Sequence, residues 1–297
     1  MSKHLISQWI TSKTGTDGLF ETCLPGVQLF HISAPRRCAP AVYEPAVVAI
    51  VSGTKEAIVD GTRYRYDNQQ YLCCSLSMPV EAGIHRASAD NPLIGVYIPI
   101  NIRLMTDLVI ELHNSGGDIP SAKTEQHSQG LALAHWDDAF AEALLRLLQL
   151  NDRPADAQVL AEGRLRELYY AVLQGEAGRS ARQAFGVGNA ISRVIAHVST
   201  HLEQPVNIEA MADMAGMSRA VFHRKFKQAT QLSPIQFIKA MRLNTAATQI
   251  AAGMTVSAAS LAMGYASSSQ FSREFKRLYG QSPRQWSEDS ALAHAAP

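Results

Sequence analysis

The pattern of apolar and polar residues changes period along the chain, and the first period is that of strands. From about Leu19 to Ile100, short β-branched and aromatic runs are separated by turn residues, which is typical of strands. Tyr64 and Tyr66 alternate with arginines, and the Asp-Gly pair at 60–61 just before them predicts a tight hairpin. Several strands at such short spacing predict a small sandwich or barrel.

The period then becomes helical. Apolar residues at helical spacing follow Ile102, leucines cluster again at 144–148, and a third helix is expected from about Asp156 to Leu173. Residues 175–188 (GEAGRSARQAFGVG) are rich in small and polar residues, so we interpret them as a linker. Residues 1–174 are therefore expected to form one domain, with strands at about 19–100 and helices at about 101–174, and residues 189–297 a second.

The second domain contains an internal repeat. The segments Met211–Pro234 and Ala259–Pro283 align with an offset of 49 residues. The matching pairs are Phe222 with Phe271, Arg224 with Arg273, Phe226 with Phe275, Lys227 with Lys276, and Ser233-Pro234 with Ser282-Pro283.

Each copy predicts a helix-turn-helix. A short helix ends at a glycine, Gly216 or Gly264, which can adopt the positive φ that a tight turn requires. A serine, Ser218 or Ser267, can then cap the next helix. In that helix two phenylalanines recur at i and i+4 on one buried face and leave polar residues outside. In a helix-turn-helix the second helix enters the DNA major groove.

A long helix is expected between the copies, from Pro234 to about Ala252, with Phe237, Ile238 and Met241 facing inward. One stiff rod carrying two recognition helices would present both to the same face of DNA, about one helical turn or 34 Å apart.

Composition and charge agree with a soluble two-domain protein. The chain has 297 residues, of which 46% are hydrophobic and 18% charged. From residue 189 onward there are 11 Lys+Arg against 6 Asp+Glu, a net of +5, whereas residues 1–188 carry 16 against 20, a net of −4. A basic terminal third favours a polyanionic partner there.

The last hundred residues resemble the DNA-binding domain of the AraC/XylS family of regulators, from about Gly188 to Asp289. The resemblance rests on Ala212, Gly216, Ser218, Arg224, Phe226-Lys227, Ser233-Pro234, Arg242-Leu243, Gly264-Tyr265 and Gln270-Phe271-Ser272-Arg273-Glu274-Phe275-Lys276. The family usually has glycine where this chain has Gln231, so the first recognition helix is expected to end without its usual left-handed residue. Ser260 replaces a usual alanine.

The N-terminal half resembles, more weakly, the cupin-like domain of one subgroup of that family, through Glu44-Pro45, the VSG at 51–53 and the YRY at 64–66. The resemblance implies an α+β chain. It would have an N-terminal cupin-like β-barrel or sandwich with a helical extension, and a C-terminal all-α domain of two helix-turn-helix units joined by a long linker helix.

Candidate DNA contacts follow from the two recognition helices. They are Arg219, Ala220, His223, Arg224 and Lys227 in the first, and Ser268, Ser269, Gln270, Ser272, Arg273 and Lys276 in the second. Arginine offers a forked donor pair to guanine or phosphate, lysine is expected at phosphates, and the polar side chains can meet base edges. Solvated side chains are the alternative for each, and most of all for His223.

The four cysteines have no metal-ligand or disulfide-framework spacing. The adjacent Cys73 and Cys74 suggest a redox or electrophile sensor, but neighbouring strand residues face opposite sides, so one thiol is expected to be buried and inert. His31 and His85 lie in the strand region without the His-x-His spacing or following Glu of a cupin metal site. We expect no metal, no cofactor and no catalytic residues.

These observations predict a sequence-specific DNA-binding transcription regulator, in the cytoplasm because no targeting or membrane-spanning segment is evident. The expected partners are double-stranded DNA, a small-molecule effector for the first domain, a second copy of the chain paired through helices near residues 135–174, and RNA polymerase, which the family resemblance implies. Two rivals remain: a cupin metalloenzyme fused to a DNA-binding tail, and an architectural protein that binds DNA without sequence preference.

Overall fold

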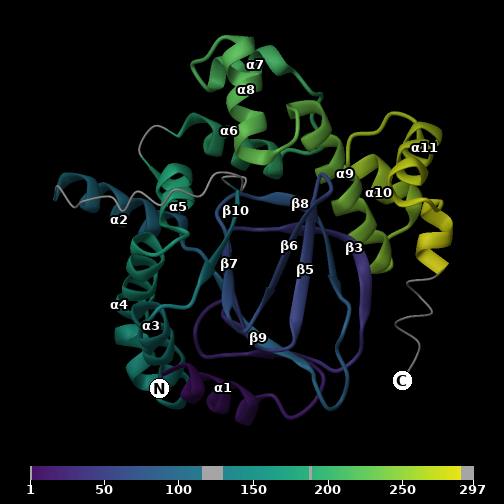
Figure 1. The fold of residues 1–297 in the computed structure, drawn as a ribbon. Coiled ribbons are helices and arrows are strands. Elements are labelled where there is room, and N and C mark those ends of the chain that lie inside the picture. Colours follow the sequence, from purple (N-terminus) through teal and green to yellow (C-terminus); the bar gives the residue numbers. More distant parts are fainter. Residues whose placement is uncertain (1, 116–129, 187–188, 289–297) are drawn as a thin grey trace.

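The computed structural model describes residues 2–115, 130–186 and 189–288. An antiparallel β-sandwich with helices on one side is followed by a wholly helical C-terminal part, which lies along the top and right of the sandwich in Figure 1.

The larger sheet has six strands in the order β1-β2-β9-β4-β7-β10, and every neighbouring pair is antiparallel. The strands are β1 (Gly18–Glu21), β2 (Gln28–Ile32), β4 (Ala46–Ser52), β7 (Gln70–Cys74), β9 (Leu93–Pro99) and β10 (Leu131–His135). Strand β10 lies beyond the region where strands were expected. A run of five mostly apolar residues is too short for its period alone to distinguish a strand from part of a helix. Pairing of Leu131 with Cys74 and of Leu133 with Leu72 makes this segment a strand.

The smaller sheet has four antiparallel strands in the order β3-β8-β5-β6. They are β3 (Arg36–Tyr43), β5 (Thr54–Val59), β6 (Thr62–Asp67) and β8 (Met78–Ile84). The predicted hairpin is confirmed, since Asp60 and Gly61 join β5 to β6 with φ of 47° and 79°. Tyr64 and Tyr66 are buried between the sheets, while the arginines that alternate with them are exposed.

Five helices lie on the side of the six-stranded sheet: α1 (Ser2–Lys13), α2 (Ile102–Asn114), α3 (Asp138–Gln149), α4 (Pro154–Gln174) and α5 (Gly178–Phe185). Helices α2 and α5 pack against α4. Phe140 of α3 stacks on Tyr71 of β7 with ring centroids 4.0 Å apart. The Tyr169 hydroxyl of α4 donates to the Pro99 carbonyl at 2.9 Å. Both faces of β7 are therefore inside the molecule.

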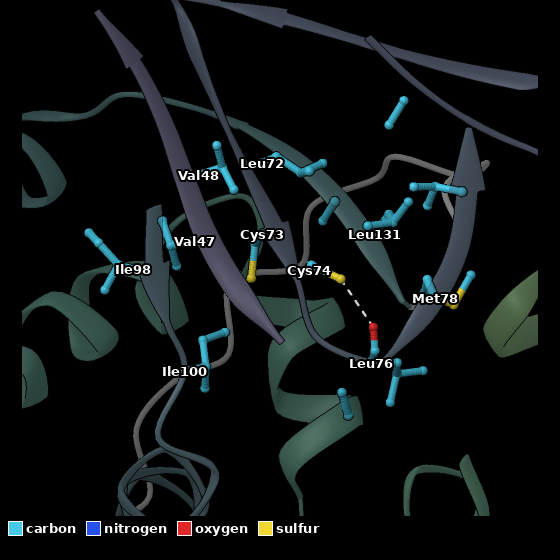
Figure 2. Packing of buried hydrophobic residues seen from close by; sticks show 14 of the residues in the cluster. Val47, Val48, Leu72, Cys73, Cys74, Leu76, Met78, Ile98, Ile100 and Leu131 are labelled. Atoms are coloured by element: carbon cyan, nitrogen blue, oxygen red, sulfur yellow. Dashed lines mark hydrogen bonds between the residues drawn. The ribbon is translucent and has the colours of Figure 1, made fainter. Parts of the chain in front are cut away.

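This covering corrects the expectation that only one of the two adjacent thiols is buried. Cys73 and Cys74 both have 1% of their surface exposed, one toward the helices and the other between the sheets. Figure 2 shows the Cys74 thiol directed at the Leu76 carbonyl, to which it donates at 3.0 Å. Burial raises the pKa of Cys73 to about 12, which disfavours the reactive thiolate.

Part of the expected linker is also regular structure. Residues 178–185 form α5, which buries Ala181, Ala184 and Phe185 against α2 and α4. Four small or apolar residues on one face are enough to pack a two-turn helix, although the composition resembles that of a loop. Residues 187–188 of the expected linker lie outside the described residues.

The C-terminal part follows the predicted helices closely. It contains α6 (Ala190–Thr200), α7 (Ile208–Met214), α8 (Arg219–Thr230), α9 (Pro234–Ala251), α10 (Val256–Ala262) and α11 (Ser268–Tyr279). Pro234 occupies the first turn of α9, and Phe237, Ile238 and Met241 are buried, as predicted. Residues 289–297 of the expected domain lie outside the described residues.

Candidate nucleic-acid interface

The two recognition helices, α8 and α11, are each held by the predicted pair of phenylalanines. Phe222, Phe226, Phe271 and Phe275 are fully buried. The ring centroids are 5.4 Å apart within the first pair and 5.5 Å apart within the second. Burial of a phenylalanine is worth roughly 1.5–3 kcal/mol. These anchors fix which side of each helix faces outward.

The turns before the recognition helices have the predicted glycine geometry. Gly216 and Gly264 have φ of 63° and 73°. Ser267 caps α11 by accepting the Gln270 amide hydrogen at 3.4 Å. The predicted cap of α8 is only half present, because Ser218 has the extended backbone of a cap residue but its side chain makes no capping bond. Ser218 is exposed, so water can satisfy the amides of that first turn.

The end of α8 corrects the expectation drawn from Gln231. This residue does adopt the left-handed conformation, with φ of 66°, and its amide donates to the Lys227 carbonyl at 2.8 Å. A residue with a Cβ adopts this conformation at a cost of roughly 1–2 kcal/mol. The Gln231 side chain also donates to the Tyr64 hydroxyl of β6 at 2.9 Å, which offsets part of that cost.

The outward faces carry the predicted DNA contacts. Exposed are Arg219, Ala220, His223, Arg224 and Lys227 on α8, and Ser268, Ser269, Gln270, Arg273 and Lys276 on α11, whereas Ser272 is half-buried. Arg224, Lys227, Arg273 and Lys276 make no ion pair or side-chain hydrogen bond with other described residues. Their cationic heads are therefore available to phosphates or bases.

Two predicted contacts are already engaged within the chain. Arg219 forms an ion pair with Glu209 of α7 at 2.9 Å. Gln270 donates to Glu274 at 3.3 Å. The Arg219–Glu209 pair is exposed, where such an interaction is worth at most about 1 kcal/mol, so DNA can compete for Arg219. Glu274 is only 14% exposed, but Gln270 itself is exposed and can turn toward DNA. Lys225 and Arg277, which the sequence reasoning passed over, add further exposed cations to the same two helices.

The central helix α9 bears an Asn that sequence reasoning did not single out. Asn244 is buried, and its side-chain amide donates to the carbonyls of Ala41 on β3 and Val80 on β8 at 2.8 and 3.0 Å. The Asn244 amide oxygen accepts from the Tyr279 hydroxyl of α11 at 2.6 Å. A polar residue on the apolar side of α9 was the available signal, but its two partners in the sandwich are 164 and 203 residues away in sequence.

The end of α8 meets the sandwich as well. The Gly130 amide, next to β10, donates to the Ala229 carbonyl at 3.1 Å. Together with the Gln231–Tyr64 and Asn244 bonds, this contact joins the first recognition helix and α9 to both sheets. We call this set of contacts the interdomain contact.

A cavity of about 680 Å³ lies beside it, between the sandwich and α6. Its walls are mostly apolar and include Leu76, Ile110, Phe185 and Ile195. The hydroxyls of Ser192 and Ser199 also line it, and each is buried without a hydrogen-bond partner among the described residues. Glu44, which accepts a hydrogen bond from Ser77, and Arg193 lie at its polar side.

Comparison with known proteins decides the family. Residues 23–180, more than half of the chain, match the family model described as the AraC-type transcriptional regulator N-terminus. The chain belongs to the AraC-type transcriptional regulators. Residues 211–289 match a helix-turn-helix domain. The predicted family and fold class are thus confirmed.

Individual relatives of this AraC-type regulator agree with the assignment. The activator RhaS of Escherichia fergusonii is 26% identical over 173 residues, 54% of this chain and 59% of RhaS. SoxS of Escherichia coli K12 is 30% identical over 94 residues, 31% of this chain and 88% of SoxS. The chain spans between about a third and three fifths of the length of the first curated relatives that it matches.

The fold is similar to that of ToxT from Vibrio cholerae, with a TM-score of 0.56 and 10% identity over 88% of this chain and 97% of ToxT. Within the described part of the chain, no helix is both long and apolar enough to cross a bilayer.

Proposed function

We propose that this AraC-type regulator binds a specific DNA sequence by inserting α8 and α11 into adjacent major-groove segments, and that a small effector controls this binding. The observation that carries the proposal is the duplicated arrangement of an exposed basic face opposite a buried phenylalanine pair. Arg224 and Arg273 are assigned to base edges, and Lys227 and Lys276 to phosphates. The proposal assigns no catalytic step to the chain.

Selection of bound duplexes from a random pool tests the proposal. The full chain should enrich a bipartite motif whose halves lie about 10–10.5 base pairs apart, and should bind it at least about 10³-fold more tightly than unrelated DNA. Enrichment without a shared motif would instead support an architectural protein.

Two matched variants assign the halves of the motif. Arg224→Ala and Arg273→Ala should each cost about 1–3 kcal/mol at one or two base positions, in different halves. Arg284→Ala is the control, because Arg284 is exposed outside both recognition helices and pairs with Glu288. Uniform weakening on all sequences would assign an arginine to phosphate instead.

We place the effector in the cavity between the sandwich and α6. The unpartnered hydroxyls of Ser192 and Ser199 favour a ligand with an apolar body and a polar group, since buried polar atoms without partners are costly. A bound ligand would touch β-domain residues and α6 at once and so bias the interdomain contact. ToxT, which shares the fold, has been solved with an unsaturated fatty acid bound.

Oleate serves as a first probe of the cavity. Ala196→Trp fills the cavity from α6 and should abolish oleate binding, measured by calorimetry, while DNA affinity without ligand stays unchanged. Ala155→Trp, at an exposed position of α4, is the matched control. Oleate binding that survives Ala196→Trp would remove the cavity as its site.

The proposal also includes two protein partners, a second copy of the chain and RNA polymerase. Helix α4 exposes Val159, Leu160 and Tyr170, an apolar set that suits pairing with another copy. We expect Val159→Asp to shift a dimer toward monomer in sedimentation experiments. Activation through polymerase rests on the family alone and is tested by transcription in a purified system.

A further inference from the structure

The outer face of the four-stranded sheet brings together three side chains of the kinds that bind transition metals. They are Cys38 of β3, Glu56 of β5 and His85, which follows β8 directly. One ligand atom from each lies within 4.8 Å of the other two. We propose that these three residues form a binding site for a zinc-like divalent cation.

Strand geometry explains why the three meet although they are distant in sequence. Glu56 lies opposite Gly83 in the β5–β8 ladder, and the β3–β8 register shifts between Arg36 and Ala39, where Cys38 lies. Gly83 leaves the space that the Cys38 sulfur occupies, since a Cβ at Gly83 would lie 2.6 Å from it. Any larger residue at 83 would displace the thiol.

The distances suit one shared ion. The His85 Nε2 atom lies 3.7 Å from the Cys38 sulfur and 3.0 Å from Glu56 Oε2. Zn–S and Zn–N bonds of about 2.3 and 2.0–2.1 Å at a tetrahedral angle place sulfur and nitrogen roughly 3.5 Å apart. A single ring nitrogen therefore faces both a thiol and a carboxylate at separations close to those of metal ligands.

An ion-pair network without metal is the competing interpretation. Glu56 is buried, and its other oxygen accepts from Arg63 at 2.7 Å, so the carboxylate is already compensated. That network does not require the Cys38 sulfur beside the same nitrogen. Arg63 is largely exposed and can withdraw when a cation arrives, which leaves Glu56 Oε2 for the metal.

The three ligand types identify the class of cation. A zinc-like cation binds a cysteine sulfur as the thiolate, so it displaces the thiol proton when it binds. One sulfur, one nitrogen and one oxygen ligand suit Zn²⁺ with a fourth position open to water, and do not suit Mg²⁺ or Ca²⁺.

The position of the site gives it a consequence for the whole molecule. The ion would tie β3 to β5 and β8, and β3 is the strand whose Ala41 carbonyl holds Asn244 of α9. Metal occupancy should therefore protect the amides of β3 from hydrogen exchange.

Cobalt binding to the full, reduced chain tests the site, with Co²⁺ as an optical substitute for Zn²⁺. We expect one equivalent of Co²⁺ to produce a thiolate-to-cobalt absorption band that Zn²⁺ displaces. Cys38→Ser should lose the band, and His85→Gln should weaken Zn²⁺ binding by at least about 10–100-fold, measured against a competing chelator. Arg63→Gln should strengthen binding, because it removes a neighbouring cation.

Cys23→Ser is the matched control, since Cys23 is the exposed thiol of the chain. Absence of the band in the folded wild type, or its persistence in Cys38→Ser, would overturn the proposal. Because His85 is half-exposed, His85→Gln is expected to stay folded, and circular dichroism verifies this. The readout requires no DNA, so its failure leaves the proposed function untouched.

Discussion

The two helix-turn-helix units share their internal packing to a degree that extends beyond the aligned repeat. Phe226 packs on Phe237 with centroids 5.3 Å apart, and Phe275 packs on Trp286 at 6.0 Å, again with the offset of 49. Ser233 and Gln236 form a capping box at α9, and Ser282 and Gln285 make the same pair of bonds. The two copies are therefore built by the same local rules.

They differ in what they touch. The first unit ends α8 at Gln231 and reaches the sandwich through the interdomain contact, whereas the second ends α11 at Gly280, whose surroundings are open. In the second unit, Glu274 accepts hydrogen bonds from Lys239 and Tyr265. The equivalent position in the first unit is the exposed Lys225. The end of the first recognition helix is therefore bonded to the sandwich, whereas the second recognition helix is held by hydrogen bonds around Glu274 within the helical part of the chain.

The largest effect should come from the anchors. Phe226→Ala and Phe275→Ala should each lower the free energy of unfolding by about 3–5 kcal/mol, because each removes a fully buried ring. Urea unfolding of the full chain measures this, with exposed Leu261→Ala as a control expected within about 0.5 kcal/mol. A small cost at only one phenylalanine would break the equivalence of the units.

The next largest effect should come from Asn244→Leu. The change removes two hydrogen bonds to backbone carbonyls and leaves the Tyr279 hydroxyl without its Asn244 acceptor, at a cost of about 1–3 kcal/mol. Hydrogen exchange of β3 and β8 should accelerate if the interdomain contact loosens. Tyr279→Phe removes only one of these bonds and should cost less. Equal exchange rates in wild type and Asn244→Leu would show that Asn244 does not hold the domains together.

Exchanging the helix-ending residues gives a smaller, asymmetric result. Gly280→Gln should destabilise by roughly 1–2 kcal/mol, because it adds left-handed strain without a partner. Gln231→Gly removes similar strain but loses the bond to Tyr64, so the net change should stay within about 1 kcal/mol. Thermal unfolding of both variants and of Tyr64→Phe measures the difference. Equal costs at the two positions would refute the role of Tyr64.

The smallest effect concerns pH. Burial opposes ionisation of Glu274, but hydrogen bonds from Gln270, Lys239 and Tyr265 outweigh it and hold the pKa below the ordinary 4.5. Glu274 therefore contributes stability above about pH 4.5, and that contribution is lost as the pH falls through the lowered pKa. The stability difference between wild type and Glu274→Gln should shrink over this acid range. A stability difference that does not change with pH over this range would show that the pKa of Glu274 is not lowered by folding.

Much of the helical domain could be predicted because its determinants are local. Gly216 and Gly264 indicate the turns, the phenylalanines at i and i+4 identify buried faces, and Pro234 marks the start of α9. The sandwich was less predictable. Strand β10 and helix α5 lack a distinctive local period, and packing against β7 and α4 decides their structure.

The sequence alone determined the family, the duplicated recognition helices and their outward residues, because each depends on spacing within about 25 residues. Only the tertiary structure decided that both Cys73 and Cys74 are buried, that Asn244 and Gln231 bridge the domains, and that Cys38, Glu56 and His85 meet. Those outcomes depend on which strands and helices become neighbours. Strand pairing and helix packing join residues up to 203 positions apart, a separation that no local pattern encodes.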